Sequence, residues 1–133
     1  NSGVTADTST LNGFVLGLKE ADPDLFDQRM ARITEQSIAM KEALEKFDLE
    51  TVGSLMTANH EILIDMGLSH EKIIDLCERA LVSGALGAKV TGGGRGGYML
   101  SLAPDEDVQN SVASAFEEDG LAVIRASIPG ELN

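Results

Sequence analysis

The chain has 133 residues, of which 43% are hydrophobic and 24% are charged, as is typical of one globular domain with its own core. Ten Lys and Arg stand against 22 Asp and Glu, giving a net charge of −12 without any basic cluster, which argues against a nucleic-acid partner. No apolar stretch approaches the roughly 20 residues of a membrane span, so we expect no membrane partner either. Solubility is the first explanation of the acidity, and adaptation to high salt is the alternative.

The sequence contains a single cysteine, Cys77, so no internal disulfide is possible. A reducing cytoplasm is the expected location. Cys77 falls in an apolar helical pattern, which favours a packed core thiol over a nucleophile. The only histidines, His60 and His70, are not spaced to bind a metal with each other or with Cys77. We therefore expect no metal site in the chain.

The first two predicted helices follow a polar start. Asp7 or Thr8 is expected to cap the first helix. Asp22 and Pro23 are typical of an N-cap followed by proline at the first helical position, and they begin a long amphipathic helix. Its apolar stripe, which we expect to be core, consists of Phe26, Met30, Ile33, Met40, Leu44 and Phe47.

Two more helices follow with apolar residues at helical spacing. Asp48 is the expected cap of the third helix, and Gly67 is expected to end it. Ser69 is predicted to begin the fourth helix, and Gly84 has the position of a residue that ends one.

After Gly84 the pattern changes to short apolar runs. Two strands are predicted at Ala88–Thr91 and Tyr98–Ala103, then a helix from Pro104 to Gly120, and a final strand at Leu121–Ile128. The predicted fold class is α+β, with helices packed on a small, mainly antiparallel sheet. Because three strands make a thin sheet, we expect a further strand just before Asn1.

A glycine-rich run lies between the two central strands. Five of the eleven residues in Lys89–Met99 are glycine, more than a tight turn needs. Consecutive backbone N–H groups in such a run form an anion-binding concavity. Thr91 adds a hydroxyl, and Arg95 adds a charge with two parallel donors. We therefore predict a phosphate or carboxylate site here, and close packing of a hairpin is the alternative.

The glycine run matches neither of the two commonest nucleotide motifs. No Lys-Ser/Thr pair follows it, so the P-loop pattern is absent. Gly92–Gly97 satisfies G-x-G-x-x-G by letter, but a strand follows where a dinucleotide-binding turn would open a helix. No nucleophile elbow or catalytic triad is present. The chain alone therefore provides no catalytic residue that we can assign.

Three segments resemble the GHMP small-molecule kinases, and within that superfamily the mevalonate kinases, especially the bacterial ones. Gly84–Gly97 is similar to their third conserved motif, G-A-x-G-A-K-[LMV]-[ST]-G-[AG]-G-x-G-G. Asn1–Thr8 resembles [DN]-[ST]-G-V-x-x-x-T, and Asn59–Ser69 resembles N-x-x-L-x-x-x-G-[VL]-S. Lys89, where galactokinases usually have Arg, favours mevalonate kinases. Gly93 and Tyr98 depart from the usual Ala and from the usual Cys or Ser.

The resemblance implies a ferredoxin-like C-terminal domain over residues 1–133, without the N-terminal half that holds the phosphate loop and the catalytic Asp and Lys. It implies a cytoplasmic enzyme, often a homodimer, that uses ATP and Mg²⁺ to phosphorylate the 5-hydroxyl of mevalonate in isoprenoid biosynthesis. ATP and Mg²⁺ would be bound mainly by the absent half. The residues implied at the substrate and phosphate are Thr8, Thr91, Gly92, Gly93, Gly94, Arg95, Gly96 and Gly97.

Two alternatives remain open at the level of sequence. One is another GHMP enzyme, such as a galactokinase or a phosphomevalonate kinase, which shares the glycine-rich loop and differs in the acceptor. The other is a ligand-binding or interaction module with no catalysis. On the kinase hypothesis the isolated chain is expected to be inactive, because the catalytic residues lie elsewhere.

Overall fold

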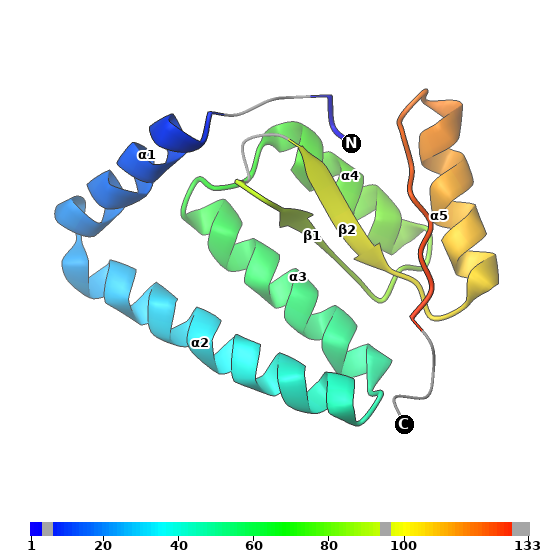
Figure 1. Ribbon diagram of the computed structural model, residues 1–133, viewed down its shortest axis with the longest axis horizontal. Helices are drawn as coiled ribbons and strands as arrows, with labels where there is room; N and C mark the ends of the chain where they lie inside the picture. Colours follow the sequence, from blue (N-terminus) through cyan, green and yellow to red (C-terminus); the bar gives the residue numbers. More distant parts are fainter. Residues whose placement is uncertain (4–6, 94–96, 129–133) are drawn as a thin grey trace.

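The computed structural model describes residues 1–3, 7–93 and 97–128, which form five helices and a two-stranded sheet (Figure 1). None of these helices is long and apolar enough to cross a membrane. In chain order the elements are α1 (Thr8–Ala21), α2 (Pro23–Glu45), α3 (Leu49–Asp65), α4 (Glu71–Val82), β1 (Gly87–Thr91), β2 (Tyr98–Leu102) and α5 (Glu106–Glu118).

Aspartate side chains cap four of the five helices. Each carboxylate accepts hydrogen bonds from amides of the first helical turn, which would otherwise lack a partner. Pro23 occupies the start of α2, as its fixed φ favours. The four caps are Asp7, Asp22, Asp48 and Asp105. These helix starts are confirmed, and Asp7 rather than Thr8 is the cap of α1.

The predicted start of the fourth helix was wrong by one residue. His70 is the N-cap of α4, and its Nδ1 accepts a hydrogen bond from the Lys72 amide at 3.1 Å. Ser69 does not cap the helix because its hydroxyl lies 2.8 Å from Nε2 of His60 on α3. A contact between helices thus displaces the cap that the local sequence predicted.

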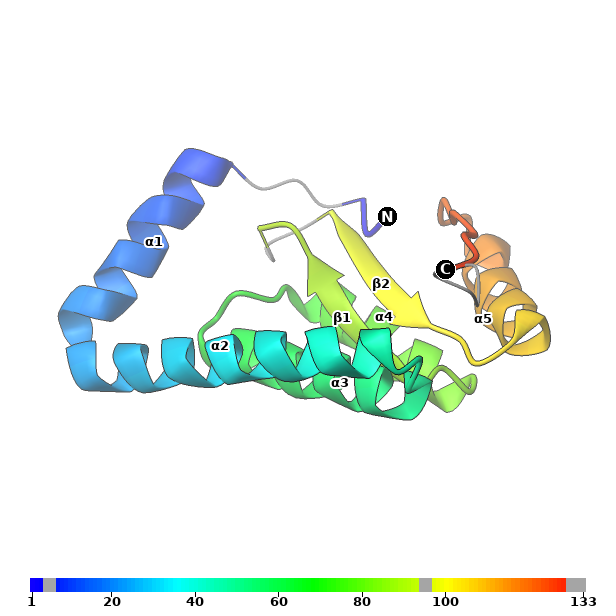
Figure 2. The ribbon, with the colours of Figure 1, turned by 60° about the horizontal axis from the view of Figure 1, so that its bottom comes forward.

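The apolar stripe of α2, which was predicted to be core, is core only in part: Met40 packs against a second buried cluster of Ala43, Val52 and Met56. Only Ala43 is buried on this helix, and Leu44 and the following Phe47 are 45% and 49% exposed. Figure 2 shows the reason: α2 lies against α3 on the side away from the sheet, while α1 rises away from both. A helix in this outer position packs mainly against α3, so its stripe is half-buried.

The sheet is an antiparallel pair whose register runs from Gly87 opposite Leu102 to Thr91 opposite Tyr98. α3 packs along β1, and α4 packs against both strands. The main core lies between α4, β1 and α5. It consists of Ile73, Leu76, Cys77, Ala80, Ala85, Ala88, Val90, Val112 and Phe116. The burial of Cys77 confirms the prediction of a packed thiol.

The final predicted strand, Leu121–Ile128, does not form in the described structure. Residues 121–128 run back beside α5 (Figure 1), and no backbone hydrogen bond links them to β2 among the described residues. Side chains hold this segment instead: the Gln109 side chain donates to the Ala126 carbonyl at 2.9 Å, Arg125 makes two hydrogen bonds to the Glu117 carboxylate, and Leu121 and Val123 pack against the core. A strand requires a paired neighbour, and this segment has none here.

Candidate functional site

The glycine-rich run joins β1 to β2 and therefore lies between two strands, as predicted. Thr91 ends β1, Tyr98 begins β2, and the two residues are partners in the register. Gly92 and Gly97 have φ values of +79° and +87°, in the region that glycine adopts without strain. The predicted site residues Gly94, Arg95 and Gly96 lie outside the described residues. The ends of the loop are thus held opposite each other by the last pair of the ladder.

The start of the chain lies against one end of this loop. The amide of Ser2 donates a hydrogen bond to the carbonyl of Gly97 at 2.7 Å, and Ser2 is only 1% exposed. This contact brings the first of the three motif segments to the third, although 95 positions of numbering separate the two residues.

Helix α1 lies against the other end of the loop. A Cβ built on Gly93 would come 2.6 Å from Cδ2 of Leu11, so α1 and the loop are in contact there. Thr8, a predicted site residue, is the first residue of α1 and stands one helical turn before Leu11. The structure therefore brings Thr8 to the side of the loop on which Gly93 lies.

A chain of three polar side chains connects the sheet to two helices behind the loop. Nζ of Lys89 on β1 donates to Oδ1 of Asn59 on α3 at 2.5 Å, and Nδ2 of Asn59 donates to Oε1 of Gln36 on α2 at 3.1 Å. Burial lowers the pKa of Lys89 below its usual value. Lys89 stands two residues before Thr91, so this chain anchors the strand that leads into the loop.

His60 lies beside this chain and is 4% exposed. Its bond to Ser69 ties α3 to the turn before α4. Burial, and in second place the charge of Lys89, lower the pKa of His60, which favours the neutral ring. The middle motif segment, Asn59–Ser69, therefore contributes a side chain to the Lys89 anchor at one end and a link between α3 and α4 at the other.

Sequence reasoning singled out the loop but assigned no role to Asn59, Gln36 or the His60–Ser69 contact. Asn59 and Ser69 stood at the two ends of a motif segment, and that was the only available signal. Gln36 carried none, because a glutamine on an amphipathic helix is ordinarily a solvent-facing residue. Its contact with Asn59 depends on how α2 crosses α3.

The chemistry available at this site is anion binding. Three features favour the binding of a negatively charged group. The ammonium of Lys89 is partly buried and has a neutral amide as its hydrogen-bond partner. Thr91 is exposed, and both ends of the loop are glycine backbone. Within residues 1–3, 7–93 and 97–128, no three His, Cys, Asp or Glu side chains gather to hold a metal ion. Cys77 is no nucleophile candidate, because burial raises the pKa of its thiol to about 12.

Comparison with known proteins gives consistent matches. A mevalonate kinase from Thermococcus gammatolerans is 35% identical over 120 residues, covering 86% of this chain and 35% of that protein. A galactokinase from Mycobacterium bovis is 39% identical over 103 residues, covering 71% of this chain and 28% of the relative. The chain thus spans about a third of the length of these curated relatives.

Solved structures match the fold as well. The crystal structure of L. major mevalonate kinase in complex with R-mevalonate superposes with a TM-score of 0.85 at 30% identity, covering 88% of this chain and 36% of that one. Residues 40–121, well over half of the chain, match the family described as GHMP kinases C terminal. The chain therefore belongs to the GHMP kinase family, as a C-terminal domain of that family.

Proposed function

We propose that residues 1–133 are the substrate-side domain of an ATP-dependent mevalonate kinase whose N-terminal half holds the nucleotide and the catalytic residues. The observation that carries this proposal is the meeting of the three motif segments at the glycine-rich loop. Ser2 and Leu11 contact its two ends, and Asn59 holds the strand that leads into it through Lys89. The similarity to L. major mevalonate kinase, whose crystal structure contains R-mevalonate, supports the choice of acceptor.

Phosphoryl transfer requires positioning and charge stabilisation more than covalent help from the protein. In the proposed role, the backbone of Thr91–Gly97 and the side chain of Arg95 approach the transferred phosphate, and Thr8 borders the acceptor. Among the described residues, the positive φ of Gly92 and Gly97 and the partly buried ammonium of Lys89 support binding of a negatively charged group such as the phosphate end of ATP. ATP would supply the phosphoryl group when bound, and ATP and Mg²⁺ would be held mainly by the N-terminal half.

The acceptor is tested with the full-length protein and a panel of mevalonate, phosphomevalonate and galactose. We expect ATP-dependent turnover of mevalonate and little turnover of the other two. Preference for galactose would favour the second candidate, a galactokinase. The 39% identity to the mycobacterial galactokinase is the observation that supports this candidate. Preference for phosphomevalonate would favour a phosphomevalonate kinase instead.

The role of the loop is tested with Gly94→Val in the full-length protein. A branched side chain in the proposed phosphate cradle should abolish turnover while leaving the far-ultraviolet circular dichroism spectrum and the melting temperature nearly unchanged. Wild-type kinetics in this variant would contradict a ligand role for the loop.

The proposed location of the catalytic residues in the N-terminal half can be tested separately. The purified 133-residue chain should have no kinase activity, because the catalytic Asp and Lys of the family are assigned to the other half. Turnover of ATP and mevalonate by this chain would contradict the assignment of the catalytic residues to the N-terminal half. Specific ligand binding by a protein that never phosphorylates anything would favour the non-catalytic module.

The wider setting is also part of the proposal. A reducing cytoplasm suits a chain whose one cysteine is buried and free. A homodimer is the expected assembly, and light scattering of the full-length protein measures it directly.

A further inference from the structure

A half-buried positive charge on β1 has no negative partner in the described structure. Lys89 makes no ion pair with any carboxylate of residues 1–3, 7–93 and 97–128, in a chain that has 22 Asp and Glu. A charge that is removed from water is ordinarily paired with an opposite charge. The hydrogen-bond partner of Lys89 among these residues is the neutral amide of Asn59. An unbalanced ammonium of this kind is available to stabilise an anion bound nearby.

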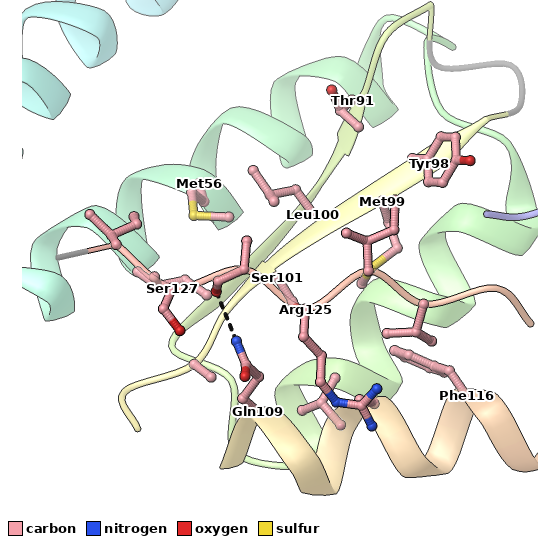
Figure 3. Close-up of a pocket in the computed structure, with 18 of the residues that line it drawn as sticks. Met56, Thr91, Tyr98, Met99, Leu100, Ser101, Gln109, Phe116, Arg125 and Ser127 are labelled. Carbon is pink, nitrogen blue, oxygen red and sulfur yellow. Dashed lines mark hydrogen bonds between the residues drawn. The ribbon is translucent and has the colours of Figure 1, made fainter. Parts of the chain in front are cut away.

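The glycine-rich loop begins within reach of this charge. Residues two apart on a strand point to the same face, so Lys89 and Thr91 share one face of the sheet. Figure 3 shows Thr91 on β1, with its register partner Tyr98 and with Leu100, the register partner of Lys89, on β2. Two residues along a strand span about 7 Å, which is less than the Debye length of about 8 Å at physiological salt. An anion held at the start of the loop therefore lies in range of the Lys89 charge.

The charge of Lys89 determines how the two amides behind it must point. An ammonium has three donors and no acceptor, so the oxygen of the Asn59 amide has to face it. The nitrogen of that amide then requires an acceptor elsewhere, and it donates to Oε1 of Gln36 at 3.1 Å. Without an acceptor at position 36, the Asn59 amide is free to rotate and to present its N–H groups to the ammonium. Gln36 therefore fixes the orientation in which Asn59 can hold Lys89.

Gln36 reaches this chain from an outer helix. It lies on α2, which packs against α3 on the side away from the sheet (Figure 2). The Gln36 side chain is half-buried, and within the described part of the molecule its hydrogen bond to Asn59 is the only one that it makes. A side chain whose single polar contact goes to the partner of Lys89 is placed to act on the loop through these two residues.

We propose that Gln36 is a positioning residue for the anion that binds at the glycine-rich loop. By accepting a hydrogen bond from Asn59, it keeps the Asn59 oxygen on Lys89 and so holds the ammonium in place beside β1. This inference rests on the proposed function, in which the anion is the phosphate end of ATP. It adds a residue of α2 that lies outside the three motif segments and acts only through other side chains.

A kinetic test uses the full-length protein and two substitutions of nearly equal size. Gln36→Met removes the acceptor, whereas Gln36→Glu keeps an acceptor oxygen. We expect Gln36→Met to raise KM for ATP about 3- to 10-fold, the change in an equilibrium constant that one hydrogen bond contributes. The kcat should stay within about twofold, because the ammonium attracts the phosphate before and during transfer alike. Gln36→Glu should restore most of the lost affinity.

The matched control is Gln28→Met, the same substitution at an exposed position of α2. It should leave both kinetic constants unchanged. In a Lys89→Met background, Gln36→Met should raise KM no further, because the group that it positions is gone. A purely structural role would instead lower the melting temperature and act equally in both backgrounds. The proposal is overturned by a wild-type KM in Gln36→Met, by an equal loss in Gln36→Glu, or by an equal loss in the Lys89→Met background.

Inorganic pyrophosphate provides a readout that needs no turnover. Its Kd for the full-length protein, measured by calorimetry, should rise about 3- to 10-fold in Gln36→Met and stay unchanged in Gln28→Met. If no acceptor is phosphorylated but this difference is found, the proposed function fails and the role of Gln36 stands. Equal pyrophosphate affinity of wild type and Gln36→Met in an active kinase would overturn the role of Gln36 alone.

Discussion

A methyl group added at Gly53 or Gly87 tests the contact through which α3 positions β1. A Cβ on Gly53 would lie 2.5 Å from the carbonyl carbon of Leu86, and a Cβ on Gly87 would lie 2.5 Å from Cα of Gly53. Ordinary contact begins at 3.4 Å. The opposing atoms are backbone, so no rotation of a side chain relieves the overlap, and α3 must move away from β1.

Overpacking of this kind typically costs about 1–3 kcal/mol and occasionally more. Gly87→Ala should therefore lower the free energy of unfolding by about 3 kcal/mol. Gly53→Ala should lower it by about 2 kcal/mol, because alanine in a helix returns up to about 1 kcal/mol. The matched control is Gly17→Ala within α1, where an added Cβ meets nothing within 4 Å. This control should stabilise the protein by about 0.5–1 kcal/mol.

Urea unfolding followed by circular dichroism measures all three variants. We expect the midpoint to fall for Gly53→Ala and Gly87→Ala and to rise for Gly17→Ala, with an unchanged slope. In thermal melts each kcal/mol corresponds to roughly 3–5 °C for a chain of this size. Wild-type stability of both Gly53→Ala and Gly87→Ala would refute the close backbone approach. Because Lys89 follows Gly87 on β1, these variants should also weaken its bond to Asn59.

Four further predictions follow from single features. Gly92→Ala should cost about 1–2 kcal/mol although the space beside it is open, because φ is +79°, and Gly92→Asn should cost less; equal stability of wild type and Ala would contradict this. Burial lowers the pKa of His60 from 6.5, so the unfolded chain binds a proton at this ring more readily than the folded chain does. The free energy of unfolding should therefore fall as the pH drops below about 6.5 and on through the folded-state pKa. His60→Gln should reduce this pH dependence in unfolding titrations. Cys77, with a pKa of about 12, should react with a thiol reagent only as fast as the protein unfolds, and immediate labelling of the native protein would show that it is accessible. A double-mutant cycle of Lys89→Met and Asn59→Leu should give a coupling of about 1–2 kcal/mol, and a coupling near zero would mean that the bond contributes nothing.

Local sequence signals located most elements because they act over a few residues. Asp48 caps its helix wherever that helix lies, and Gly67 and Gly84 adopt positive φ because a helix end requires it. The two strands were found for the same reason, since the glycine-rich run separates two short apolar segments.

The errors fall where a neighbour distant in sequence decides the outcome. The stripe of α2 has the spacing of a core helix, but α2 lies outside α3 and buries only Ala43. Leu121–Ile128 has the composition of a strand, but a strand exists only where a partner offers hydrogen bonds. Ser69 has the chemistry of a cap, but His60 engages its hydroxyl.

The sequence by itself determined the family, the helix ends and the strand-to-strand position of the glycine-rich loop, since each of these depends on nearby residues or on motif spacing. Only the tertiary structure decided that Ser2, Leu11 and Asn59 converge on that loop and the strand before it. The physical reason is that contacts between distant segments depend on how the helices pack on the sheet. Gly53 and Gly87 have no side chain and therefore permit the close backbone approach of α3 to β1.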